Sequence, residues 1–403
     1  MTVASRRTPV LPALLALPLL LVACSASEGD SGPPADGTGG RDCVGDYVEG
    51  TDYFPDKVSV EHAENFSVAY HGSYQVLQVQ QSYQGGPTET YVLYRCGTPA
   101  PEATGDLAGA TRIEVPIRSV FSGSTTHLPL LADLDRMDLL TGVSDAAAVT
   151  SPTARQRVQD GQAIEYAPNR SVDTERVIAA DPDILMTGGT DDPAYAVLRE
   201  NGVPVVANAE WLEQTPLGRA EWVKFLAAFT GDEAGAEKVF GQIAHDYEQV
   251  LAAAARTGDP VTVLPGQMYE GVWYMPAGDS YVAALIRDAN GSYAWADTAG
   301  TASVQLSLEE VLARGRDADV WLLNSDVATL GDVTADDPRY AEFAAFQNGA
   351  VWSNNARIGP GGGNDYWERG VTRPDLVLAD LVTILHPQAL PEHELEFHRQ
   401  VGR

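Results

Sequence analysis

Apolar residues in the middle of the chain recur every three or four positions, the spacing that places side chains on one face of a helix. In the segment 232–256 this stripe consists of Ala236, Val239, Phe240, Ile243, Tyr247, Val250 and Leu251. A second stripe, within 219–229, consists of Trp222, Phe225, Leu226 and Phe229. The pattern predicts a long amphipathic helix over 232–256, preceded by a shorter helix whose apolar face lies in the core.

Two distant stretches share a second pattern, a short helix with a polar cap followed by a short apolar run. One begins at Asp173 and the other at Ser307, and both residues are suitable N-caps. Glu310 completes a capping box with Ser307. In both stretches an Asn-Gly pair and a further apolar run follow. Strands that alternate with helices are typical of parallel sheets. The sequence therefore predicts an α/β fold with two Rossmann-like lobes joined by one long helix.

The strongest apolar run, residues 10–22, follows a pair of arginines near the start of the chain. It has the length of a signal-peptide hydrophobic region and is too short to span a bilayer. The run ends in Leu-Val-Ala-Cys24, which resembles a bacterial lipobox. We expect a signal peptide over 1–23, a lipid on Cys24 and a flexible tether over 24–42. An ordinary cleaved signal with a chance cysteine is the alternative, and the export route stays open.

Residues 43–110 read as a β-rich addition. Its segments 74–79 and 89–94 alternate apolar and polar positions, which predicts a hairpin. An exported chain sits where disulfides persist, so we expect Cys43 and Cys96 to pair. In the chain-entropy model such a loop closure stabilises the fold by about 4 kcal/mol. Two free thiols are the alternative. Neither cysteine has a Cys or His neighbour at zinc-site spacing, so we expect no metal there.

Charge and missing motifs make several classes of function improbable. The chain has 26 Lys and Arg against 56 Asp and Glu, a formal charge of −30, which disfavours binding to nucleic acid or to bare anionic lipid. A nucleophile elbow, a zinc-protease helix and a P-loop are all missing from the sequence. The seven histidines do not cluster. We therefore expect a protein that is not an enzyme and holds no resident cofactor or metal.

The lipobox, the doubled helix and strand unit, the single long helix and the phrase Pro216-Leu-Gly-Arg-Ala-Glu-Trp222 together resemble a known family. This family is the helical-backbone (class III) substrate-binding lipoproteins of ABC importers, which serve ferric siderophores, haem and vitamin B12. The resemblance covers about 112–388 and leaves out the β-rich addition. It implies a lipid-anchored receptor on the outer face of the cytoplasmic membrane, which captures a small molecule between two lobes and delivers it to a permease. The implied parts are an N-terminal lobe over 43–231 with the addition at 43–110, a connecting helix over 232–256 and a C-terminal lobe over 257–403.

In open α/β sheets a ligand lies beyond the carboxyl ends of the strands. The first strand is expected to end near Val120. The loops after the predicted strands are rich in aromatic residues, which stack on flat or bulky ligands. Aromatic residues at loop starts often only cap the core, so each one alone is equally a core candidate. The expected ligand-binding residues are Ser122, Thr125, His127, Trp211, Arg219, Tyr269, Trp273, Tyr274, Asn364, Tyr366 and Trp367.

The aromatic bias favours an organic chelate, and among iron chelates we rank a ferric siderophore first. Haem and cobalamin remain alternatives, because the same residue types serve them. A bare metal ion is a further alternative, since Glu210, Glu213, His127 and the tyrosines offer hard ligands suited to ferric iron. The alternative outside transport is a lipoprotein that only presents a surface for adhesion or signalling.

The resemblance also assigns two acidic residues. In the family one glutamate on each lobe docks onto arginines of the permease, and the matching positions are Glu175 and Glu309. They fall at equivalent points of the internal repeat. The alternative is that both only favour a helix dipole from the first turn, which is worth about 0.3 to 1 kcal/mol.

Overall fold

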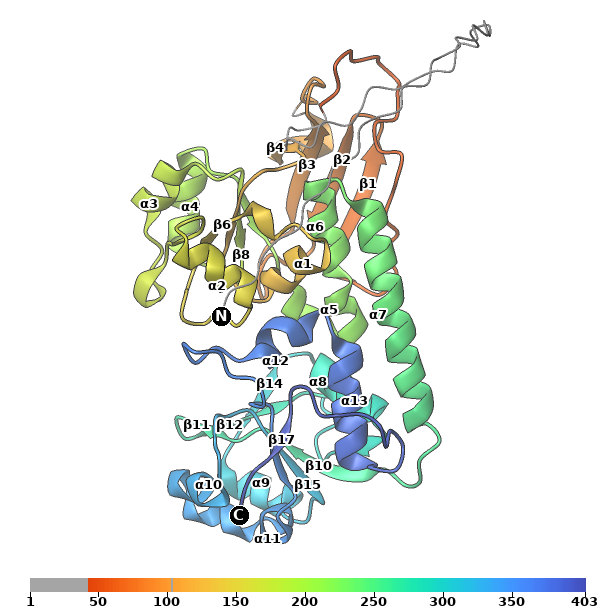
Figure 1. Ribbon diagram of the computed structural model, residues 1–403, viewed down its shortest axis with the longest axis vertical. Helices are drawn as coiled ribbons and strands as arrows, with labels where there is room; N and C mark the ends of the chain where they lie inside the picture. Colours follow the sequence, from red (N-terminus) through yellow and green to blue (C-terminus); the bar gives the residue numbers. More distant parts are fainter. Residues whose placement is uncertain (1–42, 103) are drawn as a thin grey trace, which may run out of the picture. The chain divides into compact units, whose positions relative to one another are not determined.

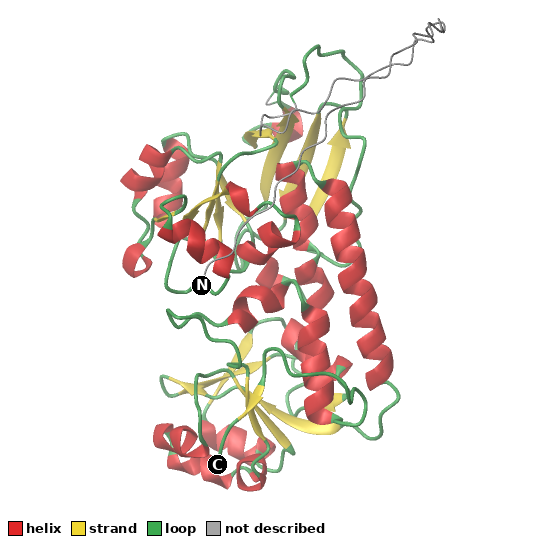
Figure 2. Cartoon of the chain, in the orientation of Figure 1, coloured by secondary structure: helices red, strands yellow, loops and turns green. Residues whose placement is uncertain are grey.

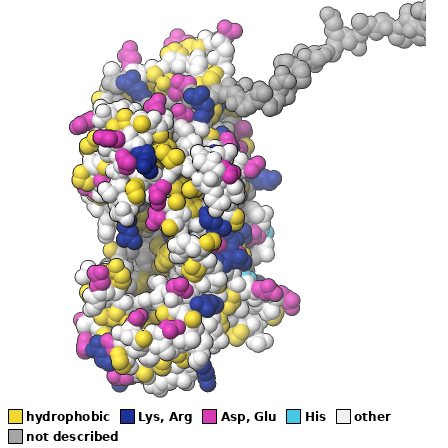
Figure 3. Space-filling model, turned by 60° about the vertical axis from the view of Figure 1, so that its left-hand side comes forward, with side chains coloured by type: hydrophobic (Ala, Val, Ile, Leu, Met, Phe, Trp, Pro, Cys, Tyr) yellow, Lys and Arg dark blue, Asp and Glu magenta, His cyan; other side chains and the backbone are white. Residues whose placement is uncertain are grey.

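The computed structural model describes residues 43–102 and 104–403 (Figure 1). The expected signal peptide, the lipidation site Cys24 and the tether lie outside these residues. Within the part described, no helix is long and apolar enough to cross a membrane. On the face drawn in Figure 3, acidic and basic side chains are interspersed.

The β-rich addition forms a four-stranded sheet in the order β1-β2-β3-β4. The first three strands are antiparallel, and β4 runs parallel to β3. The expected hairpin is the pair β2 and β3, while β1 was not predicted. β4 lies in the stretch that the sequence assigned to the family-like region. The strands are β1 (Phe66–His71), β2 (Tyr74–Val79), β3 (Glu89–Arg95) and β4 (Thr111–Val115).

A disulfide and two buried carboxylates hold this addition. Cys43 and Cys96 form the expected bond directly after β3. Glu221 accepts the backbone N–H groups of residues 61–63 at 2.7 to 2.9 Å. Glu213 accepts those of residues 64 and 65 at 2.8 and 3.0 Å. Because these contacts join segments about 150 residues apart, the addition is part of the N-terminal lobe rather than a separate appendage.

The N-terminal lobe is built on a parallel sheet in the order β7-β6-β5-β8-β9. The strand expected to end near Val120 is β5, which begins at Val120 and ends two residues later, at Ser122. Upstream residues instead form β4, which joins the other sheet, and the chain then turns at Pro116. The strands are β5 (Val120–Ser122), β6 (Leu140–Val143), β7 (Ile164–Glu165), β8 (Ile184–Thr187) and β9 (Val205–Ala207). The helices are α1 (His127–Asp133), α2 (Pro152–Gln159), α3 (Thr174–Ala180) and α4 (Pro193–Glu200).

The C-terminal lobe has a five-stranded sheet in the order β13-β10-β15-β16-β17, in which only β17 is antiparallel, and a smaller sheet β11-β12-β14. Figure 2 shows the helices in red beside the yellow strands. The strands are β10 (Val261–Pro265), β11 (Met268–Tyr269), β12 (Val272–Pro276), β13 (Gly291–Ser292), β14 (Ser303–Leu306), β15 (Val320–Leu323), β16 (Val351–Ser353) and β17 (Arg399–Gln400). The helices are α8 (Tyr281–Asp288), α9 (Leu308–Gly315), α10 (Leu330–Asp336), α11 (Ala344–Asn348), α12 (Asp365–Glu368) and α13 (Pro374–Leu385).

Three helices connect the lobes: α5 (Pro216–Ala220), α6 (Trp222–Thr230) and α7 (Glu233–Ala254). The predicted long helix is thus confirmed, and Asp232 caps it by accepting the N–H of Gly235 at 3.2 Å. Phe240 and Tyr247 of its apolar stripe are buried, whereas Leu251 is exposed. α7 packs along α6 and along α13 of the C-terminal lobe (Figure 1). One helix therefore contacts both halves of the molecule.

The internal repeat is also confirmed. Asp173 caps α3, which leads to the buried strand β8, and Ser307 caps α9, which leads to the buried strand β15. The capping box between Ser307 and Glu310 is present in both directions. A helix cap involves residues only two or three positions apart, so the sequence alone was enough to predict these caps.

Candidate ligand-binding cleft

A cavity of about 450 Å³ lies between residues of both lobes. Trp211 and Gln84 line it from the N-terminal side, and most of the remaining wall belongs to the C-terminal lobe. Pro265 and Asn324 line it at the carboxyl ends of β10 and β15. This is the edge of a parallel sheet where ligands bind. We call this cavity the aromatic cleft.

Four of the expected ligand-binding residues meet in the aromatic cleft: Trp211, Tyr274, Tyr366 and Trp367. Trp211, Tyr274 and Trp367 keep 37%, 42% and 39% of their surface exposed, so their rings are free to stack on a ligand. Tyr366 packs edge-on against Trp367, with ring centroids 4.8 Å apart. Burial raises the pKa of Tyr366, and its hydroxyl stays neutral at physiological pH.

Arg219 lies beside a smaller cavity that shares Tyr281 and Tyr366 with the aromatic cleft. Its guanidinium carbon lies 4.1 Å from the ring centre of Tyr281, and Nη2 donates to Glu210 at 3.2 Å. Burial alone would lower the pKa of Arg219, but Tyr281 and Glu210 raise it, so the guanidinium stays charged. Arg219 therefore supports the cleft wall from behind.

The two carboxylates considered as metal ligands are engaged inside the protein. Glu210 is buried against Arg219 and also accepts the backbone N–H of Trp211 at 2.6 Å. Glu213 is buried and accepts the indole N–H of Trp222 at 2.9 Å in addition to the backbone groups described above. Neither lines the aromatic cleft. This arrangement weighs against the bare metal ion reading.

Three expected residues lie elsewhere in the C-terminal lobe. Trp273 is fully buried in the core, stacked on Trp321 at 6.0 Å, so the expectation that it contacts ligand is wrong. Its neighbours in β12 and β14 turn it inward. Tyr269 is 65% exposed, but it borders a separate depression together with Glu309. Asn364 caps α12 by accepting the N–H of Tyr366 at 3.0 Å.

Ser122, Thr125 and His127 do not line the aromatic cleft. Ser122 and His127 are buried, and the Ser122 hydroxyl lies 3.1 Å from Nδ1 of His127, so the prediction of ligand contact fails for both. Burial lowers the pKa of His127 to about 3, which keeps the ring neutral. These residues do not form a loop in the cleft, because residues 120–122 are the strand β5 itself and His127 already begins α1.

Sequence reasoning missed several residues of the wall. Tyr281 follows the N-cap Ser280 of α8 and gave no signal as a ligand contact. Gln84 lies in the loop between β2 and β3 of the addition, outside the family resemblance. His398 lies near the end of the chain, far in sequence from every predicted loop. Only the folded chain brings these side chains together.

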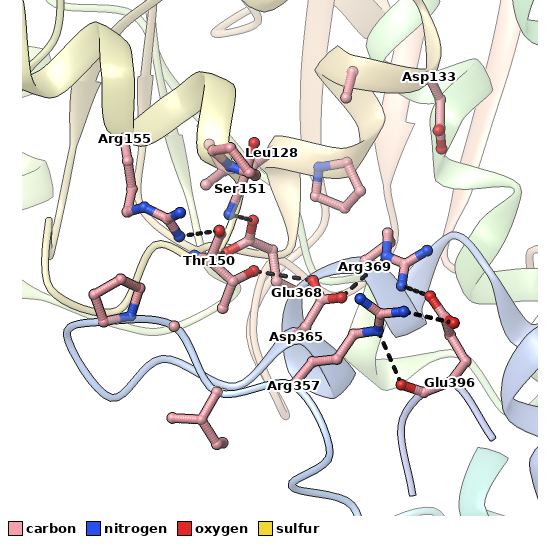
Figure 4. Close-up of a pocket in the computed structure, with 16 residues that line it drawn as sticks. Leu128, Asp133, Thr150, Ser151, Arg155, Arg357, Asp365, Glu368, Arg369 and Glu396 are labelled. Atoms are coloured by element: carbon pink, nitrogen blue, oxygen red, sulfur yellow. Dashed lines mark hydrogen bonds and ion pairs between the residues drawn. The ribbon is translucent and has the colours of Figure 1, made fainter.

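A second cavity of about 450 Å³ also lies between the lobes (Figure 4). Glu368 accepts the N–H groups of Thr150 and Ser151 at 2.7 and 2.8 Å, and it thereby holds the segment directly before α2 from the opposite lobe. Burial raises the pKa of Glu368. Nearby, a Cβ on Gly363 would overlap the carbonyl oxygen of Ala148. The glycine run at 361–363 forms a turn, in which Gly362 N–H donates to the carbonyl of Gly359, and it is also a close contact between the lobes.

Glu175 and Glu309 are both exposed and lie in the first turns of α3 and α9. Their equivalent positions in the repeat are as expected. Arg339 donates to Glu309 at 2.6 Å, an exposed pair that water screens. This geometry suits both docking and simple support of the helix dipole.

Comparison with known proteins identifies the family. The profile of the family described as periplasmic binding protein matches residues 120–356, which is more than half of the chain. The chain belongs to the periplasmic binding protein family. Its members bind small solutes and are not enzymes. The match spans most of the N-terminal lobe, α7 and the first part of the C-terminal lobe, and it begins after the β-rich addition.

Two curated relatives are lipoproteins of Methanocaldococcus jannaschii. One is 34% identical over 243 residues, which is 59% of this chain and 56% of the relative. The other is 25% identical over 345 residues, covering 82% and 83%. This binding protein thus spans a little over half the length of the first relative.

Solved structures share the fold at low sequence identity. A periplasmic haem-binding protein from Roseiflexus sp. RS-1 has a TM-score of 0.53 at 19% identity, covering 68% of this chain and 99% of that protein. A Helicobacter pylori protein with bound Ni(II) has a TM-score of 0.54 at 15% identity, covering 72% and 91%. These likenesses confirm the α/β architecture of the binding protein.

Proposed function

We propose that the protein is a lipid-anchored receptor outside the cytoplasmic membrane that captures an organic iron chelate and hands it to an ABC permease. A ferric siderophore is the first candidate ligand. The observation that carries the proposal is the aromatic cleft, in which Trp211, Tyr274 and Trp367 expose ring surface between the two lobes of a solute-binding fold.

The wall chemistry supports a chelate over a bare ion. Among the described residues that line the aromatic cleft there is no Asp, Glu, Lys or Arg. A hydrated cation would find no carboxylate ligand among these residues. A metal wrapped in organic donors presents apolar and flat surfaces, which stack on indole and phenol rings. The uncharged wall further favours a chelate of low net charge, such as a hydroxamate complex, over a highly anionic one.

The proposal extends to delivery. Glu175 and Glu309 are offered as docking points, one on each lobe, for arginines of the permease, because they are exposed at equivalent places. Cys24 is proposed as the lipid anchor, in agreement with the names of the lipoprotein relatives. The neighbouring structures that bind haem and Ni(II) show that this fold serves metal-containing ligands in other proteins.

Native mass spectrometry tests the ligand class. The soluble form, begun after Cys24, is mixed with ferric siderophores, haem, cobalamin and ferric citrate. A one-to-one adduct with a ferric siderophore is expected. The matched variants are Trp211→Ala, which removes a cleft ring, and Tyr269→Ala, which removes an exposed ring outside the cleft. Only the first should weaken the adduct. A folded protein that retains no chelate would refute the proposal and favour the surface-display alternative.

A further inference from the structure

The loop between β2 and β3 of the β-rich addition reaches the aromatic cleft. Gln84 lies near the tip of this loop and lines the cavity together with Trp211, and these two residues form the part of the wall that the N-terminal lobe supplies. The family profile begins only at residue 120. Part of the cleft wall therefore comes from a segment that the profile does not cover.

The loop has a defined shape. Residues 83–86 form a turn closed by a hydrogen bond of 2.8 Å from the last N–H to the first carbonyl, and Gly85 at its third position has a φ of +73°. Beside the turn, the buried Ser82 donates its N–H and its hydroxyl to the carbonyl of Pro87 at 3.1 and 3.0 Å. Gln84 occupies the second position of the turn, where it stays exposed.

Asn65, directly before β1, holds this loop in place. It is buried; its side-chain oxygen accepts the N–H of Gln81 at 2.9 Å, and its amide nitrogen donates to the carbonyl of the same residue at 3.1 Å. The amide nitrogen also donates to the carbonyl of Ala209 at 3.4 Å, and the backbone N–H of Asn65 donates to Glu213 at 3.0 Å. One residue thus joins the loop of the addition to the segment that carries Trp211.

The side-chain amide of Gln84 is available to a ligand. No residue within 43–102 and 104–403 forms a hydrogen bond with this side chain. A glutamine amide has two N–H donors and one carbonyl acceptor, so it can pair with another amide in both directions. Asn324 brings a second amide to the cleft from the C-terminal lobe. Both lobes therefore present an uncharged amide to the same cavity.

We infer that the β2–β3 loop is part of the ligand-binding site and that Gln84 recognises an amide group at the periphery of the ligand, an inference that rests on the proposed function. These hydrogen bonds go to the organic shell of the ligand and leave its metal untouched. Two sources share this chemistry: an amide-linked hydroxamate siderophore and a corrinoid with carboxamide side chains. Haem carries carboxylates instead, and an uncharged wall does not compensate their desolvation.

The test uses the full-length chain in detergent micelles and two neutral hydroxamate complexes with the same iron core. Ferrioxamine E joins its three hydroxamates through amides. Ferric tris(acetohydroxamate), kept intact by excess acetohydroxamate, has no such amides. Cyanocobalamin and haemin are the further probes, and tryptophan fluorescence measures the affinity for each.

Gln84→Ala and Gln84→Met should each weaken the binding of ferrioxamine E by about three- to tenfold, the effect of losing one hydrogen bond. The affinity for the acetohydroxamate complex should stay within about twofold of the wild type. Gln84→Met keeps the length of the side chain and thereby separates hydrogen bonding from packing. Gln80→Ala is the matched control, because this exposed glutamine lies in the same loop but does not line the cleft, and it should change neither affinity.

The outcomes are separable. If the wild type binds ferrioxamine E and both Gln84 variants bind it equally well, the inference is wrong and the proposed function stands. Equal weakening of the two hydroxamate complexes, or full affinity in Gln84→Met, also overturns the inference, because the contact is then packing. If cyanocobalamin alone shows the loss, the inference holds and a corrinoid replaces the siderophore. If the wild type binds haemin alone, the inference is wrong and the receptor function stands. If it binds no probe, both are wrong.

NMR spectroscopy observes the amide directly. The ligand is then a diamagnetic one, either the gallium complex of the same siderophore or cyanocobalamin. The side-chain NH₂ signals of Gln84, assigned by their loss in Gln84→Met, should shift when the protein is saturated, and those of Gln80 should not. Unmoved Gln84 signals in the saturated protein would overturn the inference.

Discussion

Removing the carboxylate of Glu221 should loosen the β-rich addition from the rest of the N-terminal lobe. This fully buried side chain receives three backbone N–H groups and lies 3.0 Å from Nζ of Lys224, which is also buried. In Glu221→Ala, Lys224 keeps the carbonyl of Ser59 at 2.6 Å and the carboxylate of Glu237 at 3.1 Å. Glu237 is more exposed and stabilises the cation less.

The magnitude follows from these contacts. Breaking a buried pair by removing one partner costs about 3 to 5 kcal/mol. The remaining contacts of Lys224 offset part of this, so we expect a loss of about 3 to 4 kcal/mol in the free energy of unfolding. With an unfolding entropy of about 2.1 cal/mol/K per residue over roughly 360 residues, the melting temperature falls by about 4 to 5 °C if unfolding is cooperative.

Guanidinium unfolding followed by tryptophan fluorescence measures the loss. Glu237→Ala is the matched control, because Glu237 is a half-buried partner of the same lysine and water can replace it there and at the N–H of Ser59, so its loss should cost less than about 1 kcal/mol. Hydrogen exchange should speed up at residues 61–63 in Glu221→Ala alone. Equal losses in both variants, or a loss below about 1 kcal/mol in Glu221→Ala, would refute the reasoning.

Three further predictions concern the lobes and the permease. Gly363→Ala should destabilise by about 1 to 3 kcal/mol in thermal unfolding, since its Cβ meets backbone of the opposite lobe, whereas Gly359→Ala, with its nearest neighbour at 3.4 Å, should be close to neutral. Burial raises the pKa of Glu368, so over a range of pH its carboxyl group is protonated in the folded state and ionised in the unfolded chain. The contribution of Glu368 to stability therefore falls as pH rises through the raised pKa. Glu368→Gln should flatten that part of a melting profile taken between about pH 4 and 7, and an unchanged profile would count against it. Glu175→Arg with Glu309→Arg should abolish uptake at normal ligand affinity, and unchanged uptake would exclude docking.

The fold was predictable where the signal is local. The stripe of α7 and the caps of α3 and α9 depend on residues three or four positions apart, and the structure has these elements as predicted. The start of β5 was not predictable, because the chain upstream of it forms β4, which pairs with β3 in a different sheet. Long-range pairing leaves little trace in a single sequence.

The aromatic cleft was predictable only in part, for a similar reason. Trp211 and Trp273 both fall in segments that were expected to follow strands, and they look alike in sequence. Trp273 is buried because β12 pairs with β14 and turns it onto Trp321, a contact between distant segments. His398 was missed because its place in the cleft wall depends on a hydrogen bond to Asp380, 18 residues earlier on another element. Residue type indicated the chemistry of the site, and strand pairing decided which residues reached it.

The short strand β17 has a practical consequence. It pairs with β16 through Ser353 and Arg399, and a bridge between Thr329 and Gly402 follows it. Without this segment, β16 would be an apolar edge open to strand addition from a second molecule. A reporter or affinity tag fused directly after Arg403 would disturb the pairing of β17, which directly follows His398 in the chain. Trimming the last few residues should therefore give aggregates before it gives a merely weaker receptor.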